Sequence, residues 1–453
     1  MSALDRTQPP TSGSIRKFDF PDVERRTLQN GLDLRVCKLS RLPVVSTNLF
    51  FRAGETRLVE SRAGLAVLTG DALEGGTQQR SGTELAEALD GIGARLGVTT
   101  GWEGTSVSMS CLADRFEEAL GLLAEAVLEP AFPEEEVDRA REQQLAAIRQ
   151  RAMDPGSLAS MEASRRYFVT GIPYARPQDG TEQSIGAVKR DLLSNFADAC
   201  YRPQGGALIV VGDLDPDEME AMANHRLGAW TGAPRADKEF SVDPVTRERR
   251  VWVVHREGSV QSELRIGHVG TDRATPDYFP LSVGNMLFGG SFTSRLNLNL
   301  REKNGFTYGV RSRFGFRSRP GPFSVSTSVG TDVTAPAVRE IVSELEKFVD
   351  AGPTDEEVAA TRDYAAGVFG LQLETAGQIA SRISQLVVYG LPDGYYQTYR
   401  DKLRAVATDE VARAVRGHIR PAEVQVVVVG DADEIVTPLE ALDLGPVEVC
   451  SAD

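Results

Sequence analysis

The chain has 453 residues, and at about 100–200 residues per domain this length predicts roughly two to four domains. A hydrophobic content of 41% and a charged content of 25% are typical of a soluble globular protein. The net charge of −15 argues against a nucleic-acid-binding protein and is compatible with a surface or cavity that attracts basic peptides.

The four cysteines are scattered along the chain and include no CxxC pair, which is typical of unlinked thiols in a reducing compartment. The polar tail that ends near Ser14 has neither the apolar core of a signal peptide nor the pattern of a transit peptide. No later stretch approaches the ~18 consecutive apolar residues of a membrane span. We therefore expect a cytoplasmic protein without a membrane segment.

Strands and helices follow one another through the first half of the chain. Polar and apolar residues alternate in the predicted strands, and apolar residues recur every three or four positions in the predicted helices. The strands are expected at 27–36, with an Asn-Gly turn, and at 44–52, 105–112 and 207–211. The helices are expected at 60–73, 83–92, 115–128 and 133–151.

The order of motifs in this first half recurs in the second half at a fixed distance. Three pairs of motifs are each separated by 218 residues (420 − 202, for example): SVS at 106 and 324, Arg-Pro at 202 and 420, and VVGD at 210 and 428. A fixed period of this kind indicates a tandem duplication of a unit of about 220 residues. The predicted domains are 15–231 and 251–445, and the polar stretch 232–250 is the predicted linker.

Each unit contains hairpins and paired helices instead of a strict alternation of strand and helix. This order favours an α+β fold with two homologous domains, each a mainly antiparallel β-sheet covered by helices on one face.

Several motifs, in this order and spacing, resemble the pitrilysin and insulin-degrading-enzyme family of zinc metallopeptidases, especially the short bacterial members with two homologous domains per chain. The resemblance extends from Leu28 to Asp433. It rests on FRAGE at 51–55, LFGGSFTSRL at 287–296 and REKNGFTY at 301–308. The resemblance implies that the chain forms half of a clamshell that encloses a peptide.

Active members of this family carry an HxxEH motif, in which two histidines bind zinc and the glutamate is the general base. The matching positions here are Val67, Gly70 and Asp71, so the resemblance implies that the zinc site has been lost. Zinc needs about three protein ligands. The four histidines show no pair at helical or strand spacing: His225, His255, His268 and His418.

Three acidic residues are further candidates for metal ligands. Asp71 and Glu74 lie three apart on one face of the predicted helix and could hold a hard cation, although acids of this kind are usually solvated. Glu142 lies in the helix where the family places a further glutamate ligand. One carboxylate cannot hold zinc alone.

The second unit retains the other half of the family's catalytic site. In the family an arginine and a tyrosine seven residues apart bind the substrate backbone and stabilise the oxyanion, and Arg301 and Tyr308 match them here. The sequence predicts a helix that ends at Asn304-Gly305 and a strand that starts at Phe306. Arg301 would then lie in the last helical turn, and Tyr308 would be third in the strand.

The side chains of this segment also allow a purely structural interpretation. The apolar side of the helix is predicted to carry Phe292, Leu296, Leu298 and Leu300. An arginine in a last helical turn is favoured by the helix dipole alone. Tyr308 also fits a core stripe along the strand: Phe306, Val310, Phe314 and Phe316.

The resemblance implies a catalytically incomplete subunit of a heterodimeric zinc metallopeptidase. Such a subunit would supply Arg301 and Tyr308 in trans, bind no cofactor itself, and be inactive without a homologous zinc-binding partner. The alternative is a non-catalytic structural or peptide-binding scaffold of the same fold. A stand-alone enzyme ranks last, because the chain has no GxSxG or CxxC motif. The substrate peptide, the identity of the partner and a homodimer of the isolated chain all stay open.

Overall fold

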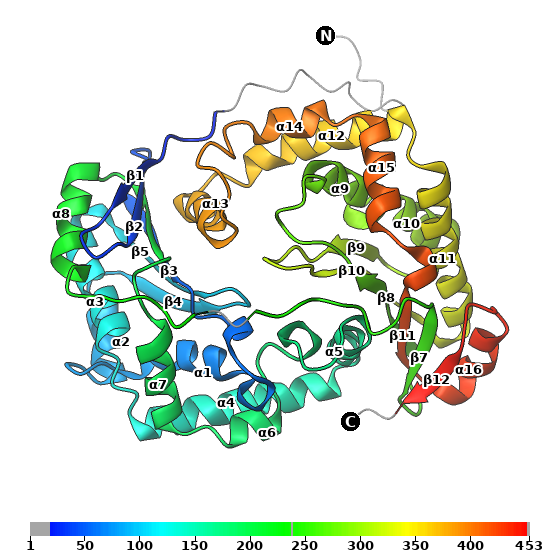
Figure 1. Ribbon diagram of the computed structural model, residues 1–453, viewed down its shortest axis with the longest axis horizontal. Coiled ribbons are helices and arrows are strands. Elements are labelled where there is room, and N and C mark those ends of the chain that lie inside the picture. The colour runs from blue at the N-terminus through cyan, green and yellow to red at the C-terminus, as the bar shows by residue number, and fades with distance from the viewer. Residues whose placement is uncertain (1–18, 237–238, 451–453) are drawn as a thin grey trace, which may run out of the picture.

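The computed structural model of the protein describes residues 19–236 and 239–450. The predicted polar tail up to Ser14 and the first residues of the predicted first domain lie outside the described residues. The described chain forms two six-stranded sheets on opposite sides of the molecule (Figure 1), each with its own hydrophobic core. None of the described helices is long and apolar enough to cross a bilayer.

The first sheet contains the strands that the sequence predicts for the first unit. Its strands, in spatial order, are β1 (Glu24–Thr27), β2 (Asp33–Lys38), β6 (Ala207–Gly212), β3 (Val44–Phe51), β5 (Thr105–Leu112) and β4 (Arg95–Thr100). The helices around it are α1 (Leu65–Asp71), α2 (Gly82–Gly91), α3 (Phe116–Leu128), α4 (Glu134–Met153), α6 (Glu182–Gly186), α7 (Arg190–Cys200) and α8 (Pro216–Leu227). Only β2 and β6 pair in parallel.

The second sheet repeats this arrangement. Its strands, in spatial order, are β12 (Val447–Cys450), β7 (Arg250–His255), β11 (Gln425–Gly430), β8 (Gln261–Val269), β10 (Pro322–Gly330) and β9 (Val310–Phe314). The helices around it are α9 (Tyr278–Asn285), α10 (Arg295–Asn297), α11 (Thr334–Ala351), α12 (Asp355–Leu371), α14 (Tyr399–Ala405), α15 (Thr408–His418) and α16 (Ala432–Glu440). β7 pairs in parallel with both β11 and β12.

The duplication is visible element by element. β6 and β11 are the third strands of their sheets and begin 218 residues apart (425 − 207), and α7 and α15 show the same separation (408 − 190). The α+β class is therefore confirmed. Both sheets are mixed, with antiparallel pairs in the majority. The two copies differ at one edge, where β1 runs antiparallel to β2 but β12 runs parallel to β7.

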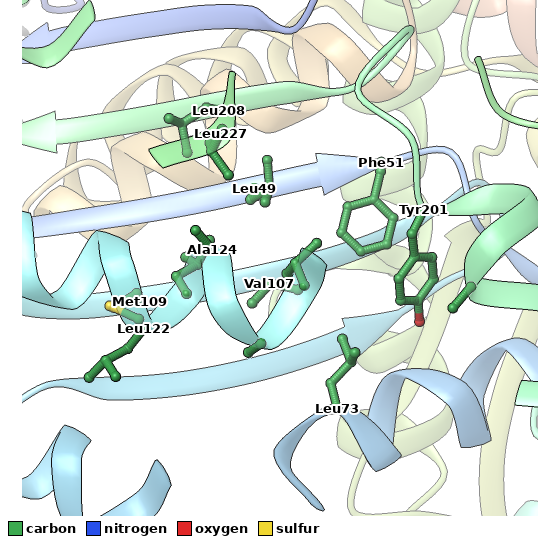
Figure 2. Packing of buried hydrophobic residues seen from close by; sticks show 14 of the residues in the cluster. Leu49, Phe51, Leu73, Val107, Met109, Leu122, Ala124, Tyr201, Leu208 and Leu227 are labelled. Atoms are coloured by element: carbon green, nitrogen blue, oxygen red, sulfur yellow. The ribbon is translucent and has the colours of Figure 1, made fainter. Parts of the chain in front are cut away.

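The core of the first unit lies between its sheet and α3. Burial alternates along β5, which places Val107 and Met109 on the inner face. Figure 2 shows these two side chains with Leu49 of β3 on the side that faces Leu122 and Ala124 of α3. The alternation predicted for 105–112 from its polar and apolar residues is confirmed.

Two helices pack on the sheet of the opposite unit. α5 (Pro155–Tyr167) follows α4 in sequence but packs on β8 and β11, and α13 (Ala376–Val388) packs on β3 and β6 (Figure 1). Ile383 of α13 shares a core with Ile209 of β6, and Leu158 of α5 shares one with Val429 of β11. Each sheet is therefore covered on both faces, and the prediction of helices on one face was wrong. This exchange buries apolar surface between the units.

The predicted linker 232–250 has no helix and no continuous strand among its described residues before β7 begins at Arg250. It is nevertheless packed against the protein. The ring of Phe240 lies edge-on to that of Tyr174, with 5.4 Å between the centroids, and residue Pro244 forms an isolated bridge with Phe168. The boundaries of the two domains stay a prediction.

Candidate functional site

The helix that matches the family's zinc helix is α1. One helix is predicted over 60–73, but α1 begins only at Leu65, because Gly64 adopts a left-handed conformation with φ of 82°. The buried Glu55 carboxylate accepts the N–H groups of Gly64 at 3.1 Å and Ala66 at 2.9 Å and so caps the helix. Arg176 lies 3.7 Å away. Burial raises the pKa of Glu55 to about 7.

The residues at the three zinc-motif positions do not fit a zinc ion. Val67 and Gly70 have no donor side chain, which leaves the carboxylate of Asp71 alone. A Cβ atom at position 70 would lie 2.4 Å from Oγ1 of Thr100 on β4, so any larger residue here would have to displace the Thr100 side chain. Within 19–236 and 239–450, no three His, Cys, Asp or Glu side chains lie where they could hold a metal ion.

Asp71 and Glu74 line a pocket of about 340 Å³ between α1 and α4. Partial burial in this pocket raises the pKa of both carboxyls, and the charge of Asp71 adds to the effect on Glu74. α4 presents Gln143 and Gln144 to the pocket. Glu142 instead points to solvent beside Arg141 at 3.9 Å and does not reach the position of a metal ligand.

The histidines do not supply a missing ligand. His268 on β8 is 2% exposed, and its Nε2 accepts the backbone N–H of Arg420 at 3.0 Å. Its Nδ1 therefore carries the proton and donates to the carbonyl oxygen of Val269 at 2.8 Å. Burial and the positive charge of Arg420 lower the pKa of His268 to about 3. This histidine is a neutral core residue.

The helix that carries Arg301 is shorter and less regular than the sequence predicts. α10 spans only Arg295–Asn297 and continues as a π-helical turn over Leu298–Lys303. The predicted stop is confirmed, since Gly305 has φ of 66° and its N–H donates to the carbonyl of Arg301 at 3.1 Å. Arg301 lies in the last helical turn, as predicted.

Two features predicted for this segment were wrong. Leu296 is fully buried, but Phe292 is 64% exposed and Leu298 is 51% exposed. Phe292 lies in the turn before the helix, and Leu298 is two positions from Leu296, so it points to the opposite face. The strand β9 begins at Val310 and not at Phe306.

The start of β9 is set by the buried side chain of Asn297. Its Nδ2 donates to the carbonyl of Val310 at 2.9 Å, and its Oδ1 accepts the N–H of Val310 at 3.1 Å. The same Nδ2 also donates to the carbonyl of Ser291 at 3.1 Å and to Oγ of Ser294 at 3.0 Å. One side chain thus holds together the two ends of the segment that contains Arg301 and Tyr308.

Tyr308 lies in the loop before β9, and its side chain is 95% exposed. The backbone around it is fixed, because Oγ1 of Thr307 accepts the N–H of Gly309 at 3.1 Å and Oγ1 of Thr327 lies 3.0 Å from that of Thr307. Tyr308 makes no hydrogen bond or ring contact to any described residue. The interpretation of Tyr308 as a member of a core stripe is therefore wrong.

Arg301 is partly exposed, at 34% for its side chain, and Nε lies 3.5 Å from Oε1 of Glu302. Its guanidinium lies over the ring of Phe292, with 4.3 Å between Cζ and the ring centroid. No hydrogen bond or ring contact joins Arg301 to Tyr308 in the described chain. The two side chains extend from one corner of the second unit, with their polar groups unused by the core.

The roles of Asn297 and Phe292 were not predicted from the sequence. An asparagine beside two leucines in a predicted apolar helix face is the signal that could have revealed Asn297, because a buried amide needs backbone partners. No sequence signal separates an exposed phenylalanine from a core one.

Comparisons with known proteins identify the family. The model described as Insulinase (Peptidase family M16) matches residues 40–165, and that described as Peptidase M16 inactive domain matches 187–364. The Helicobacter pylori protein named non-peptidase homolog YmxG is 25% identical, over 83% of this chain and 87% of that protein. A protein of Mycobacterium tuberculosis named uncharacterized zinc protease is 26% identical, over 87% of this chain and 90% of its own length.

Solved structures show the same relationship. The crystal structure of a peptidase M16 inactive domain from Pseudomonas fluorescens has a TM-score of 0.85 and 27% identity, and covers 90% of this chain and 98% of that one. A protease from Helicobacter pylori has a TM-score of 0.84 at 18% identity, which shows the shared fold alone. The zinc-motif positions of this chain hold Val67, Gly70 and Asp71. Since family models match both of its units, the chain belongs to peptidase family M16, the pitrilysin and insulinase family, as a member without the family's zinc motif.

Proposed function

We propose that this chain is the catalytically incomplete subunit of a heterodimeric zinc metallopeptidase and supplies Arg301 and Tyr308 to a peptide bound at the zinc site of a homologous partner. The observation that carries the proposal is the 95% exposure of Tyr308 on a loop whose backbone is fixed. A large aromatic side chain held this way, with no hydrogen bond or ring contact to the described residues, is available to a second molecule.

The chemistry of the two side chains fits this role. When zinc in the partner activates a water molecule, its attack on a peptide bond places negative charge on the carbonyl oxygen. The guanidinium of Arg301 and the phenol of Tyr308 can both donate hydrogen bonds to that oxygen, and neither has to change its protonation state. One preorganised donor of this kind typically contributes about 3–4 kcal/mol to lowering the barrier.

The zinc-motif helix supports the other half of the proposal. Position 70, where the family has its general base, is glycine, and a side chain there would meet Oγ1 of Thr100. This chain therefore depends on another chain for the general base. The similarity to a protein named non-peptidase homolog agrees with a chain that is inactive alone. We include the heterodimeric assembly and a cytoplasmic location in the same proposal.

Reconstitution tests this proposal. The purified chain is assayed with a mixture of fluorogenic peptides, alone and with a homologue from the same genome that contains HxxEH, and the metal content of the lone chain is measured. We expect no bound zinc and no cleavage by the lone chain, and cleavage when both chains are present. A homologue whose activity is the same with and without this chain would overturn the proposal.

A peptide-binding scaffold is the second candidate, and one feature favours it. A pocket of about 760 Å³ beside Val67 is lined by residues of both units, among them Ser157 and Ser160 of α5 and Arg265 of β8. Its lining combines polar and apolar side chains, which suits an extended peptide. Micromolar binding of peptides by the lone chain, without any effect on the activity of the homologue, would favour this candidate.

A further inference from the structure

Phe292 is exposed in a way that packing does not explain. Its side chain is 64% exposed in the turn just before α10, although phenylalanine is usually buried. Its contact in the described structure is with Arg301, whose guanidinium carbon lies 4.3 Å from the ring centroid. That distance is well within the range of a cation–π interaction.

The backbone that carries the ring is fixed. The N–H of Ser294 donates to the carbonyl of Ser291 at 3.2 Å, which closes the turn around Phe292. The Nδ2 of Asn297 donates to the carbonyl of Ser291 at 3.1 Å and to Oγ of Ser294 at 3.0 Å. A phenylalanine has only two side-chain torsions, so an anchored turn leaves its ring few orientations.

The guanidinium of Arg301, in contrast, has little else to hold it. Its other partner among the described residues is the carboxylate of Glu302, 3.5 Å from Nε, and the Glu302 side chain is itself 55% exposed. Stacking on a ring uses the face of the guanidinium and leaves the N–H groups at its edge free for hydrogen bonds. The ring therefore restrains the plane of Arg301 without occupying the donors at its terminal nitrogens.

We propose that Phe292 is a positioning residue for Arg301: its ring holds the guanidinium in one plane, with the terminal N–H groups turned outward to the carbonyl oxygen of a peptide. This inference rests on the proposed function of Arg301 and gives a role to Phe292, which lies within the motif at 287–296 but to which the family resemblance assigns no function. Since Phe292 acts through Arg301, its contribution vanishes when the guanidinium is removed.

The test uses the reconstituted complex of this chain with its HxxEH homologue. We expect Phe292→Leu to lower kcat about two- to fivefold with little change in KM, and Phe292→Trp to retain at least the wild-type value, because indole binds cations best. In an Arg301→Ala background, Phe292→Leu should have no further effect. Leu298→Ala is the matched control, since Leu298 is exposed on the same segment and contacts no cation that we identify.

A second measurement examines the stacking itself in the lone chain. The ring of Phe292 should shift the NMR signal of the Arg301 Nε–H group upfield, and this shift should disappear in Phe292→Leu and persist in Leu298→Ala. An equal loss of kcat in the presence and absence of Arg301, or an unshifted signal, would overturn the inference. If Arg301→Ala leaves activity unchanged, the proposed function fails; if it lowers activity but Phe292→Leu does not, only the positioning role fails.

Discussion

Replacement of Asn297 by alanine tests the structural basis of the corner that carries Arg301 and Tyr308. β9 is an edge strand, and the Asn297 side chain binds both backbone polar groups of Val310 on the side of β9 that has no neighbouring strand. Val310 is fully buried, so Asn297→Ala leaves its N–H and C=O without partners. Each unpaired buried group costs about 1–3 kcal/mol, and we expect a loss of about 3 kcal/mol in the free energy of unfolding.

Urea denaturation followed by circular dichroism measures this loss, and amide exchange of Val310 locates it. Asn304→Ala is the matched control. The Nδ2 of Asn304 donates to the carbonyl of Asn299 at 3.0 Å and to its Oδ1 at 2.6 Å. The carbonyl keeps the backbone N–H of Asn304 as a donor, so only Oδ1 of Asn299 loses its partner. We expect this control, with one side-chain acceptor unpaired, to cost about 1 kcal/mol, which is less than the two unpaired backbone groups of Asn297→Ala.

The reasoning fails if Asn297→Ala costs no more than Asn304→Ala, or if the exchange of the Val310 amide is unchanged. Either result would mean that the position of Tyr308 does not depend on the side chain of Asn297, which binds Val310 at the start of β9.

The other predictions concern stability and metal binding. Folding lowers the pKa of His268 to about 3, so below the ordinary histidine pKa of about 6.5 the unfolded chain binds more protons than the folded one. The free energy of unfolding should therefore decrease as the pH is lowered. Between pH 7 and pH 5, urea denaturation should show a decrease about 2 kcal/mol larger in the wild type than in His268→Gln. An equal pH dependence in the two proteins would contradict this. Gly70→Ala should cost about 1–3 kcal/mol through its contact with Oγ1 of Thr100, and Thr100→Ala should restore most of that loss; additive effects in the double variant would exclude the contact as the cause. Added zinc should leave the Tm of the lone chain unchanged in calorimetry, and a rise that a chelator reverses would reveal a metal site.

The sequence predicted the sheets well because both copies of the unit carry the same order of strand motifs. β5 was predicted to the residue, since its polar and apolar residues alternate without a break. The ends of α4 were predicted to within two residues from Pro133 and the acids that follow it. Local signals of this kind act within a few residues and do not depend on the rest of the fold.

The exchange of α5 and α13 was not predictable from these signals. The apolar face of α13 shows that Ile379 and Ile383 need a partner surface, but it does not say which sheet provides it. The choice depends on alternate residues of β6: Leu208 faces the core of its own unit, and Ile209 faces α13. A strand that is apolar on both faces predicts two covering layers without naming them.

The candidate site was predicted in its residues and only partly in its geometry. The motif spacing located Arg301 in the last helical turn, which the structure confirms. The sequence predicted that Tyr308 lies inside a strand. In the structure the strand begins only at Val310, where the side chain of Asn297, 13 residues earlier in the chain, binds the backbone. Tertiary hydrogen bonds of this kind override local strand propensity.

The activity of the Tyr308→Phe variant in the reconstituted complex tests the central claim most directly. Because Tyr308 is 95% exposed, the substitution removes a hydroxyl without disturbing the core of this chain, and the stability of the lone chain should not change. If the phenol stabilises the oxyanion in trans, kcat should fall by about 200- to 800-fold, and Arg301→Ala should have an effect of similar size. Wild-type kcat and KM for both variants would contradict the account.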